Sequence, residues 1–313
     1  MRHLFFLSFF FIAFSAYSQH FSGEIQYELS IIPKVENLDV DSLIQKKKGT
    51  LTKYLITDGY YKSTHYQNGE VSYSYTYDNV SKSMYDDAPD DEYITYRDSR
   101  KSYHEYFGSE IYRDSTEIVN GYECFMVKHE SEFANSTTYY SDQIKVNFES
   151  FRDHAVGNWY NKLKEVDGCI TLKSIYEYDT YYEVQEAVKI TPMILKPADF
   201  SLPTNKIIVA SPLALDTAVE LVPPSPAQIE LYEELVVEGA KKLEPEASYV
   251  SYISFVLYKD GQIDYIEAME NDPHGFNKLA VEIFKQCDFK FKPGLIEDRE
   301  VSSVAYLPIR FSR

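Results

Sequence analysis

The side chains that could do catalytic or metal chemistry are present in this chain of 313 residues, but their spacing does not assemble a site. No G-x-S-x-G elbow, phosphate-binding loop, H-E-x-x-H motif or dinucleotide-binding glycine pattern occurs. The histidines of the chain beyond its N-terminal run are scattered without metal-ligand spacing: His20, His65, His104, His129, His154 and His274. We therefore predict that the protein is not an enzyme and has no catalytic residue, no cofactor and no metal site.

Carboxylates are dense between Asp86 and Glu92, and together they could hold a Ca²⁺ ion. The segment lacks the D-x-D-x-D-G spacing that places oxygens around one ion. We favour a solvated hairpin tip, with a calcium loop as the alternative.

Three cysteines are an odd number for an oxidising compartment. Cys124 and Cys169 could form a disulfide that leaves Cys287 over, although no C-x-x-C motif is present. All three could equally be small buried apolar residues, and the sequence leaves both alternatives open.

Tyrosine is the most unusual residue of the chain, at 29 of 313 positions. Tyr73, Tyr75 and Tyr77 alternate with small polar residues, which predicts a strand with one aromatic face. One candidate site is an apolar ligand face, for a lipid or a glycan, made of Tyr73, Tyr75, Tyr77, Tyr176 and Tyr178. The alternative, which we favour, is that these rings fill a core.

Short β-prone segments with period-two alternation run through residues 19–195, where helical periodicity is poor. They predict a curved antiparallel sheet of eight or more strands. Prolines then interrupt residues 196–228, which indicates a linker that could lie partly extended along the first domain.

The pattern changes again in residues 229–313. A helix after Pro226 is followed by a strand to Leu257, an Asp260-Gly261 turn and a return strand from Ile263 to Ala268. We expect the next helix to start with Asp272 as N-cap and Pro273 at its first position, and a last strand to cover 301–311. This order predicts a three-stranded antiparallel sheet with a helix packed across it.

The first 18 residues have the pattern of a cleaved signal peptide: a basic start, a short apolar run and small residues at Ala16 and Ser18. The apolar run is shorter than the roughly 20 residues that span a bilayer. We therefore expect a periplasmic or secreted protein that does not span the membrane after cleavage. The net charge of −18 argues against nucleic acid as a partner.

The C-terminal segments together resemble the TonB C-terminal domain family. The similar residues are the hairpin 252–263, the helix with Leu279-Ala280, the stretch Phe289 to Gly294 and the end Pro308-Ile309-Arg310-Phe311. TonB itself has an uncleaved inner-membrane helix and a long Pro-rich arm, and this chain has neither, which puts energy coupling in doubt.

Residues 19–195, together with the segment 199–203 that follows them, more faintly resemble secreted half-barrel proteins related to the lipoprotein carriers LolA and LolB. The resemblance is carried by the segments 21–27, 120–124, 139–144 and 199–203. It implies a curved sheet around an apolar cavity, and an unrelated β-sandwich is the alternative.

These resemblances give two functional hypotheses. The first is a non-enzymatic cell-envelope interaction protein, whose TonB-like module adds a strand from an envelope protein or peptide, such as an outer-membrane transporter. The edge that we expect to bind this strand is the last one, at Val301, Ser302, Ser303, Val304, Ala305 and Tyr306. The alternative is a periplasmic carrier that holds a lipid or lipoprotein in the half-barrel.

Overall fold

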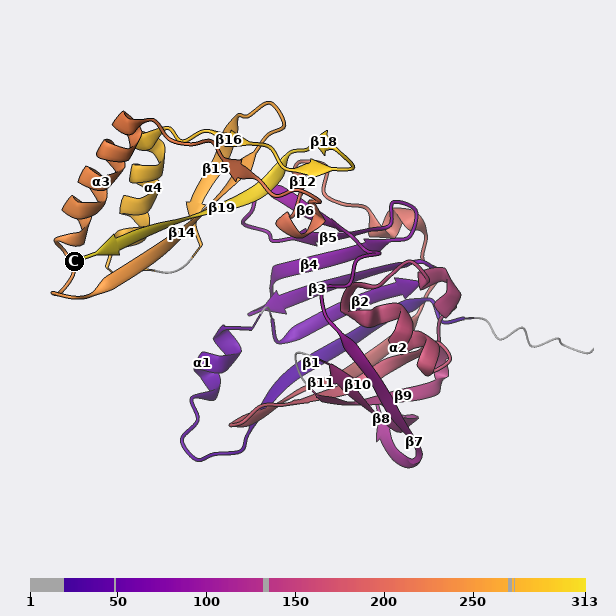
Figure 1. Cartoon of the computed structure of the whole chain (residues 1–313). Helices are drawn as coiled ribbons and strands as arrows, with labels where there is room; N and C mark the ends of the chain where they lie inside the picture. The colour runs from indigo at the N-terminus through magenta and orange to yellow at the C-terminus, as the bar shows by residue number, and fades with distance from the viewer. Residues whose placement is uncertain (1–19, 48, 132–134, 270–271, 273) are drawn as a thin grey trace, which may run out of the picture.

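The protein is mainly β, and most of its strands join one sheet that runs through the whole molecule (Figure 1). The computed structural model describes residues 20–47, 49–131, 135–269, 272 and 274–313. The predicted signal peptide, residues 1–18, lies outside the described residues. Within them the large sheet has fifteen strands, in the order β15-β14-β19-β12-β6-β5-β4-β3-β2-β1-β11-β10-β9-β8-β7.

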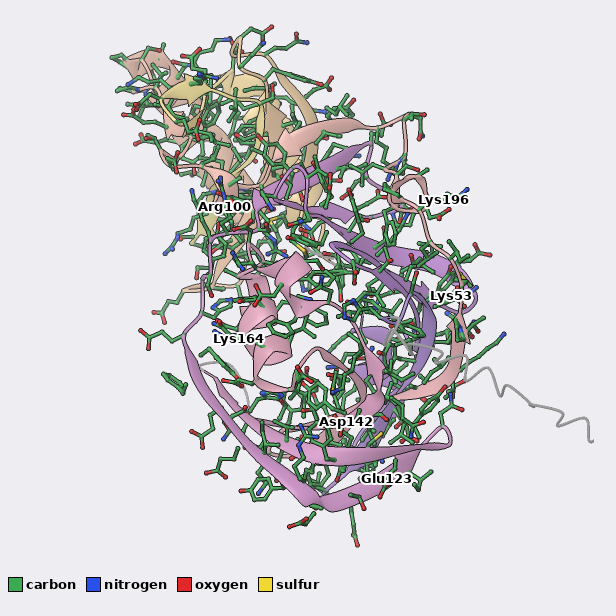
Figure 2. All side chains as sticks on the ribbon, turned by 90° about the vertical axis from the view of Figure 1, so that its right-hand side faces the viewer. Lys53, Arg100, Glu123, Asp142, Lys164 and Lys196 are labelled. Atoms are coloured by element: carbon green, nitrogen blue, oxygen red, sulfur yellow. The ribbon has the colours of Figure 1, made fainter. Side chains whose placement is uncertain are left out.

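Eleven of these strands form a curved antiparallel sheet from the N-terminal region, which we call the half-barrel. The prediction of a curved antiparallel sheet with eight or more strands is confirmed. Its strands are β1 (Gly23–Pro33), β2 (Leu51–Thr57), β3 (Tyr60–Gln67), β4 (Glu70–Asp78), β5 (Ser83–Asp87), β6 (Tyr93–Asp98), β7 (Tyr106–Val119), β8 (Tyr122–Ser131), β9 (Ser136–Lys145), β10 (Cys169–Glu177) and β11 (Tyr181–Pro192). Figure 2 shows Lys53, Glu123 and Asp142 at separate places on this sheet.

The strand register fixes which side chains share the concave face. Tyr54 lies opposite Ser63, which lies opposite Tyr75, and directly paired residues point to the same side of a sheet. This face is covered in part by a segment that contains η1 (Phe148–Phe151), η2 (Val156–Asn158) and α2 (Trp159–Glu165). Phe151 and Leu163 from this segment are buried in the same core cluster as Ile25 and Ile56 of the sheet.

Two short helices of the half-barrel were not predicted. Helix α1 (Val40–Gln45) lies in the connection between β1 and β2, and α2 lies against the concave face. The sequence pattern of α2 is a stripe of only three apolar residues, Trp159, Leu163 and Val166, which is too short to stand out as a helical periodicity.

The proline-rich segment 196–228 is more ordered than the predicted linker. It contains η3 (Pro197–Phe200), β12 (Ile207–Ala210), η4 (Pro212–Ala214) and β13 (Glu220–Leu221). Strand β12 pairs in parallel with β6 of the half-barrel and, at Ala210, with Ser303 of the C-terminal sheet. The segment therefore joins the two sheets into one instead of separating them.

The carboxylates between Asp86 and Glu92 lie at the β5–β6 hairpin, as predicted. One of them forms an ion pair with a lysine of the segment 196–228. The Lys206 ammonium donates to Asp87 Oδ1 at 2.8 Å and to the carbonyl of Ala88 at 2.5 Å. Only 11% of the Lys206 side chain and 17% of the Asp87 side chain are exposed. This ion pair helps to attach β12 to the half-barrel.

The C-terminal region has the predicted order of elements. These are α3 (Pro226–Ala240), β14 (Ser248–Leu257), β15 (Ile263–Ala268), α4 (Phe276–Cys287), β16 (Phe291–Lys292), β17 (Leu295–Ile296), β18 (Arg299–Glu300) and β19 (Ser303–Ser312). Strands β15, β14 and β19 are antiparallel, and both α3 and α4 contribute to one core with them.

The predicted start of α4 is wrong by a few residues. The helix begins at Phe276, with Gly275 as its N-cap, and Pro273 lies outside the described residues. Asp272 still acts near the helix start, because its carboxylate accepts the backbone N–H of His274 and of Asn277.

A small apolar cluster, which we call the seam, fills the junction of the two regions. It contains Tyr93 of β6, Val209 of β12, Val256 of β14 and Val304 of β19. All four are buried, so the junction is a packed interior and not a solvated hinge.

Candidate functional site

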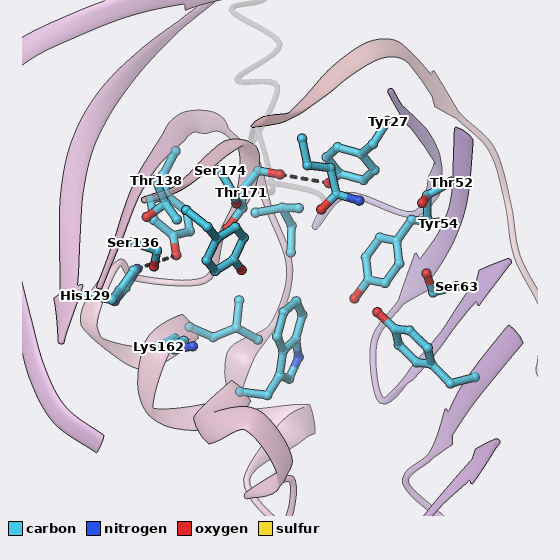
Figure 3. Close-up of a pocket in the computed structure, with 17 residues that line it drawn as sticks. Tyr27, Thr52, Tyr54, Ser63, His129, Ser136, Thr138, Lys162, Thr171 and Ser174 are labelled. Atoms are coloured by element: carbon cyan, nitrogen blue, oxygen red, sulfur yellow. Dashed lines mark hydrogen bonds between the residues drawn. The ribbon is translucent and has the colours of Figure 1, made fainter. Parts of the chain in front are cut away.

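A cavity of about 210 Å³ lies between the concave face of the half-barrel and α2 (Figure 3). Seventeen residues line it: six are aromatic, nine are polar and only two, Leu163 and Ile170, are aliphatic. The aromatic ones are Tyr27, Tyr54, Tyr75, Tyr140, Trp159 and Tyr176. The cavity is therefore amphipathic, and it differs from the purely apolar interior that the half-barrel resemblance implies.

The sequence alternation explains why these side chains meet. Tyr27 of β1 is paired with Thr52 of β2, and both point to the concave side with Tyr54 two residues further on. Trp159, Lys162 and Leu163 are three and four residues apart on α2, so the helix presents them on one side.

Hydrogen bonds fix part of the wall. The Tyr27 hydroxyl donates to the backbone carbonyl of Thr171 at 2.8 Å. His129 Nε2 is hydrogen-bonded to the Tyr140 hydroxyl at 2.9 Å, and its Nδ1 lies 3.3 Å from the Tyr106 hydroxyl. Burial, helped by the nearby Lys162 charge, lowers the pKa of His129 to about 4, so this imidazole is neutral at pH 7.

Two polar atoms of the wall are buried with no hydrogen-bond partner among the described residues. They are the hydroxyl of Tyr54 and the indole Nε1 of Trp159. Burial raises the pKa of Tyr54 well above its ordinary value, so its hydroxyl keeps its proton. An unpaired buried polar group is unfavourable and calls for a water molecule or a ligand beside it.

Lys162 is a half-buried cation in the same wall (Figure 3). Burial lowers its pKa, and the charge of Glu165 opposes that effect. Among the described residues, no carboxylate oxygen lies within 4.0 Å of Lys162 Nζ, so none forms an ion pair with it. The Glu165 carboxylate instead accepts hydrogen bonds from the hydroxyls of Tyr106 and Ser109.

A second hollow of about 310 Å³ adjoins the cavity at the rim of the half-barrel. The two share Thr52, Tyr176 and Gln185 in their walls. The cation at this rim, Lys47, is paired with Glu183, so its charge is compensated. The cavity and the hollow are therefore neighbours, with the three shared side chains in the wall of both.

The predicted tyrosine face is only partly assembled as a site. Tyr75 and Tyr176 line the cavity, and Tyr178 lines the hollow at the rim. Tyr73 donates a hydrogen bond to Asp86 away from the cavity wall, and Tyr77 is fully buried with its ring stacked 4.2 Å from that of His154. Of the five rings, Tyr77 thus belongs to the core, whereas Tyr75, Tyr176 and Tyr178 line hollows. Their role in binding a ligand stays a prediction.

The last strand is less free than the sequence suggested. Val301 and Ser302 precede β19, the Ser302 carbonyl accepts the Ala210 N–H at 2.9 Å, and Ser303 pairs with β12 as well as with β14. Of the six residues 301–306, Tyr306 has the exposed side chain, at 47%. The outer strand of this end of the sheet is β15. Strand addition at 301–306 stays a prediction, and β12 already occupies part of that edge.

The cysteines are buried free thiols, so the possible disulfide between Cys124 and Cys169 is absent from the structure. The described residues contain no group of three or more His, Cys, Asp or Glu that could hold a metal ion. Within the same residues, no helix has the length and hydrophobicity needed to cross a bilayer.

Comparisons with known proteins give distant structural similarity alone. No protein-family model and no curated protein matches the chain. Among solved structures, the chain is similar to a domain from Vibrio parahaemolyticus assigned to outer membrane lipoprotein sorting. The sequence identity is 10% and the TM-score 0.25, over 57% of this chain and 89% of that one. At this TM-score the similarity does not assign a function or a ligand. No family model and no curated protein supports the TonB resemblance of residues 229–313.

Sequence reasoning missed the residues that give the cavity its chemistry. Lys162 and Trp159 lie on the unpredicted helix α2, and His129 lies 33 residues before Lys162 in the chain. The one available signal was Trp159 itself, because it is the single tryptophan of the chain and follows a glycine-containing turn.

Proposed function

We propose that this protein is a non-enzymatic carrier of the cell envelope, which holds one small amphiphilic molecule in the cavity of its half-barrel. The observation that carries the proposal is the cavity between the sheet and α2, whose wall combines six aromatic rings with nine polar side chains. Such a wall can hold the apolar part of a ligand by its rings and orient the polar part by its hydroxyl groups. The envelope location rests on the predicted signal peptide.

The cavity volume limits the size of the ligand. A dry cavity of about 150 Å³ holds benzene, and drug-sized ligands occupy about 300–1,000 Å³. At about 210 Å³ the cavity holds one ring or one short chain, and a longer chain would extend into the hollow at the rim. We therefore favour a single-chain or single-ring amphiphile over the several acyl chains of a lipoprotein.

The single tryptophan provides the test. Trp159 lines the cavity, so a bound molecule changes its fluorescence. Titration with decanol is expected to give a saturable change with one site per chain. Thr138→Leu, which places a larger side chain in the cavity wall, should weaken binding at least ten-fold.

The matched control is Thr137→Leu. Thr137 is the neighbour of Thr138 on β9 and therefore points to the opposite face of the sheet. It should bind decanol as the unmodified protein does. Fluorescence that does not saturate with any amphiphile, or equal binding by both variants, would contradict the carrier proposal.

A second candidate function is docking of an envelope partner by the C-terminal sheet. The observation that favours it is the position of β15 at the end of the fifteen-stranded sheet. A bulge between β14 and β15, with Tyr265 at a φ of 51°, shortens the regular part of this edge. Capture of a partner that is lost on replacing Ile266 by Pro would support docking there, since proline removes a backbone donor. Retained capture would exclude that edge.

A further inference from the structure

We propose that the molecule held in the cavity is an anionic amphiphile, with an acid group that pairs with Lys162 and an apolar chain or ring that lies among the tyrosines. This inference rests on the proposed carrier function, because it names the chemistry of the ligand that the cavity would hold. A carboxylate is the simplest acid group that fits the donors described below.

The charge balance of the cavity is the first argument. Lys162 brings a cation into the wall, and the described residues offer it no ion pair. Its neighbours are the Glu165 carboxylate, one oxygen of which accepts hydrogen bonds from two hydroxyls, and the Tyr106 ring, whose centroid lies 5.9 Å from the ammonium. By contrast, Lys47 at the rim is paired with Glu183. The uncompensated charge is therefore inside the cavity, and an anionic ligand would complete the ion pair there.

The unpaired donors are the second argument. An ammonium and an indole N–H can only donate hydrogen bonds, and Lys162 and Trp159 lie three residues apart on the same side of α2. Trp159 Nε1 has no partner among the described residues, and neither has the buried hydroxyl of Tyr54 (Figure 3). A carboxylate offers two oxygens that accept from such donors, whereas a cationic ligand offers none.

The remaining wall fits the apolar part of the same molecule. Leu163 and Ile170 add aliphatic surface beside the rings of Tyr27, Tyr75 and Tyr176. The rim hollow shares three wall residues with the cavity, so it is the space nearest to the far end of a longer chain. The acid group would thus lie innermost, at α2, and the chain would point toward the rim.

Three probes with the same chain and different charge test this assignment: decanoate, decanol and decylammonium, each titrated at pH 7 by Trp159 fluorescence. We expect decanoate to bind at least ten-fold more tightly than decanol, and decylammonium most weakly. In Lys162→Met, the affinity for decanoate should fall about ten-fold to a hundred-fold, the range expected for the loss of a hydrogen bond to a charged group. The affinity for decanol should stay within about two-fold, because the neutral probe makes no ion pair.

Two further variants test whether a lower affinity comes from the lost charge or from a folding defect. Lys162→Arg keeps the charge and should retain most of the decanoate affinity. Lys164→Met removes a charge two residues along the same helix, at an exposed position labelled in Figure 2, and should leave all three affinities unchanged. Circular dichroism and the urea midpoint of each variant establish that it is folded.

The outcomes separate this inference from the carrier proposal. The inference would be overturned by equal binding of decanoate and decylammonium, or by an unchanged decanoate affinity in Lys162→Met. In either case, saturable binding of decanol would still support the carrier proposal. A protein whose Trp159 fluorescence responds to none of the probes would overturn both.

Discussion

The ion pair between Lys206 and Asp87 provides the clearest prediction about how the two regions are held together. Its distance is 2.8 Å, and the Lys206 ammonium also donates to the Ala88 carbonyl. The two side chains are 11% and 17% exposed, so water screens the pair only in part. Lys206→Met keeps the length of the stem but leaves the Asp87 carboxylate without its cation.

The expected loss follows from that burial. Removing one partner of a buried ion pair costs about 3–5 kcal/mol, because the other charge is left uncompensated. Since this pair keeps some exposure, we expect the lower end, about 3 kcal/mol, for Lys206→Met. Adding Asp87→Asn removes the stranded charge, so the double variant should lose less than the sum of the two single losses.

Urea unfolding at pH 7, followed by far-UV circular dichroism, measures these losses in the free energy of unfolding. Trp159 fluorescence, recorded in the same samples, reports on the half-barrel alone. The control is Lys292→Met, which breaks a pair of similar length with Glu220 whose side chains are 61% and 64% exposed. It should lose about 0.5 kcal/mol or less. An equal, small loss for both lysine variants would refute the argument that this buried ion pair attaches β12 to the half-barrel.

Three other predictions follow from local features. Burial lowers the pKa of His154 to about 3, below the value of about 6.5 in an unfolded chain, so the unfolded chain takes up more protons between these values. The free energy of unfolding should therefore fall as the pH drops from about 6.5 toward 3, by up to about 1.4 kcal/mol per pH unit. His154→Phe should weaken this pH dependence, which urea unfolding at several pH values in this range measures. In thermal melts, Gly168→Ala should destabilise the fold by about 2 kcal/mol or more, because its φ is +77° and a Cβ would lie 2.3 Å from the Val146 carbonyl oxygen. The control Gly121→Ala has a similar φ of +84° but open space around it, so it should cost only about 1 kcal/mol. Burial raises the pKa of Cys124 to about 11 and that of Cys169 to about 12. Iodoacetamide should therefore leave both thiols unlabelled in the folded protein at pH 8. Rapid labelling, detected by mass spectrometry, would contradict their burial.

The strands could be predicted from the sequence because their pattern is local. Alternation such as that of Tyr73, Tyr75 and Tyr77 is fixed by the pleat of a single strand, and it correctly indicated β4. The Asp260-Gly261 turn likewise placed the hairpin of β14 and β15. The same local information indicated that the tyrosines share a face, but it could not say which rings end in the core and which line a cavity.

The elements that could not be predicted depend on contacts far apart in the sequence. Strand β12 has only four residues between prolines, and it is a strand because β6 and β19 offer it partners on both sides. Helix α2 has seven residues, and its burial against the sheet stabilises it more than its own propensity does. The cavity needs the register of eight strands together with α2, so neither its volume nor the position of Lys162 was within reach of sequence patterns.

If the half-barrel carries a single small acid, native mass spectrometry of the protein purified gently from the envelope of its host will detect that molecule. We expect a one-to-one complex with a small molecule that carries one acid group, and loss of that extra mass in Lys162→Met. Purification of the protein with a multi-chain lipid, with a cationic molecule, or without any bound mass from fresh envelope would contradict it.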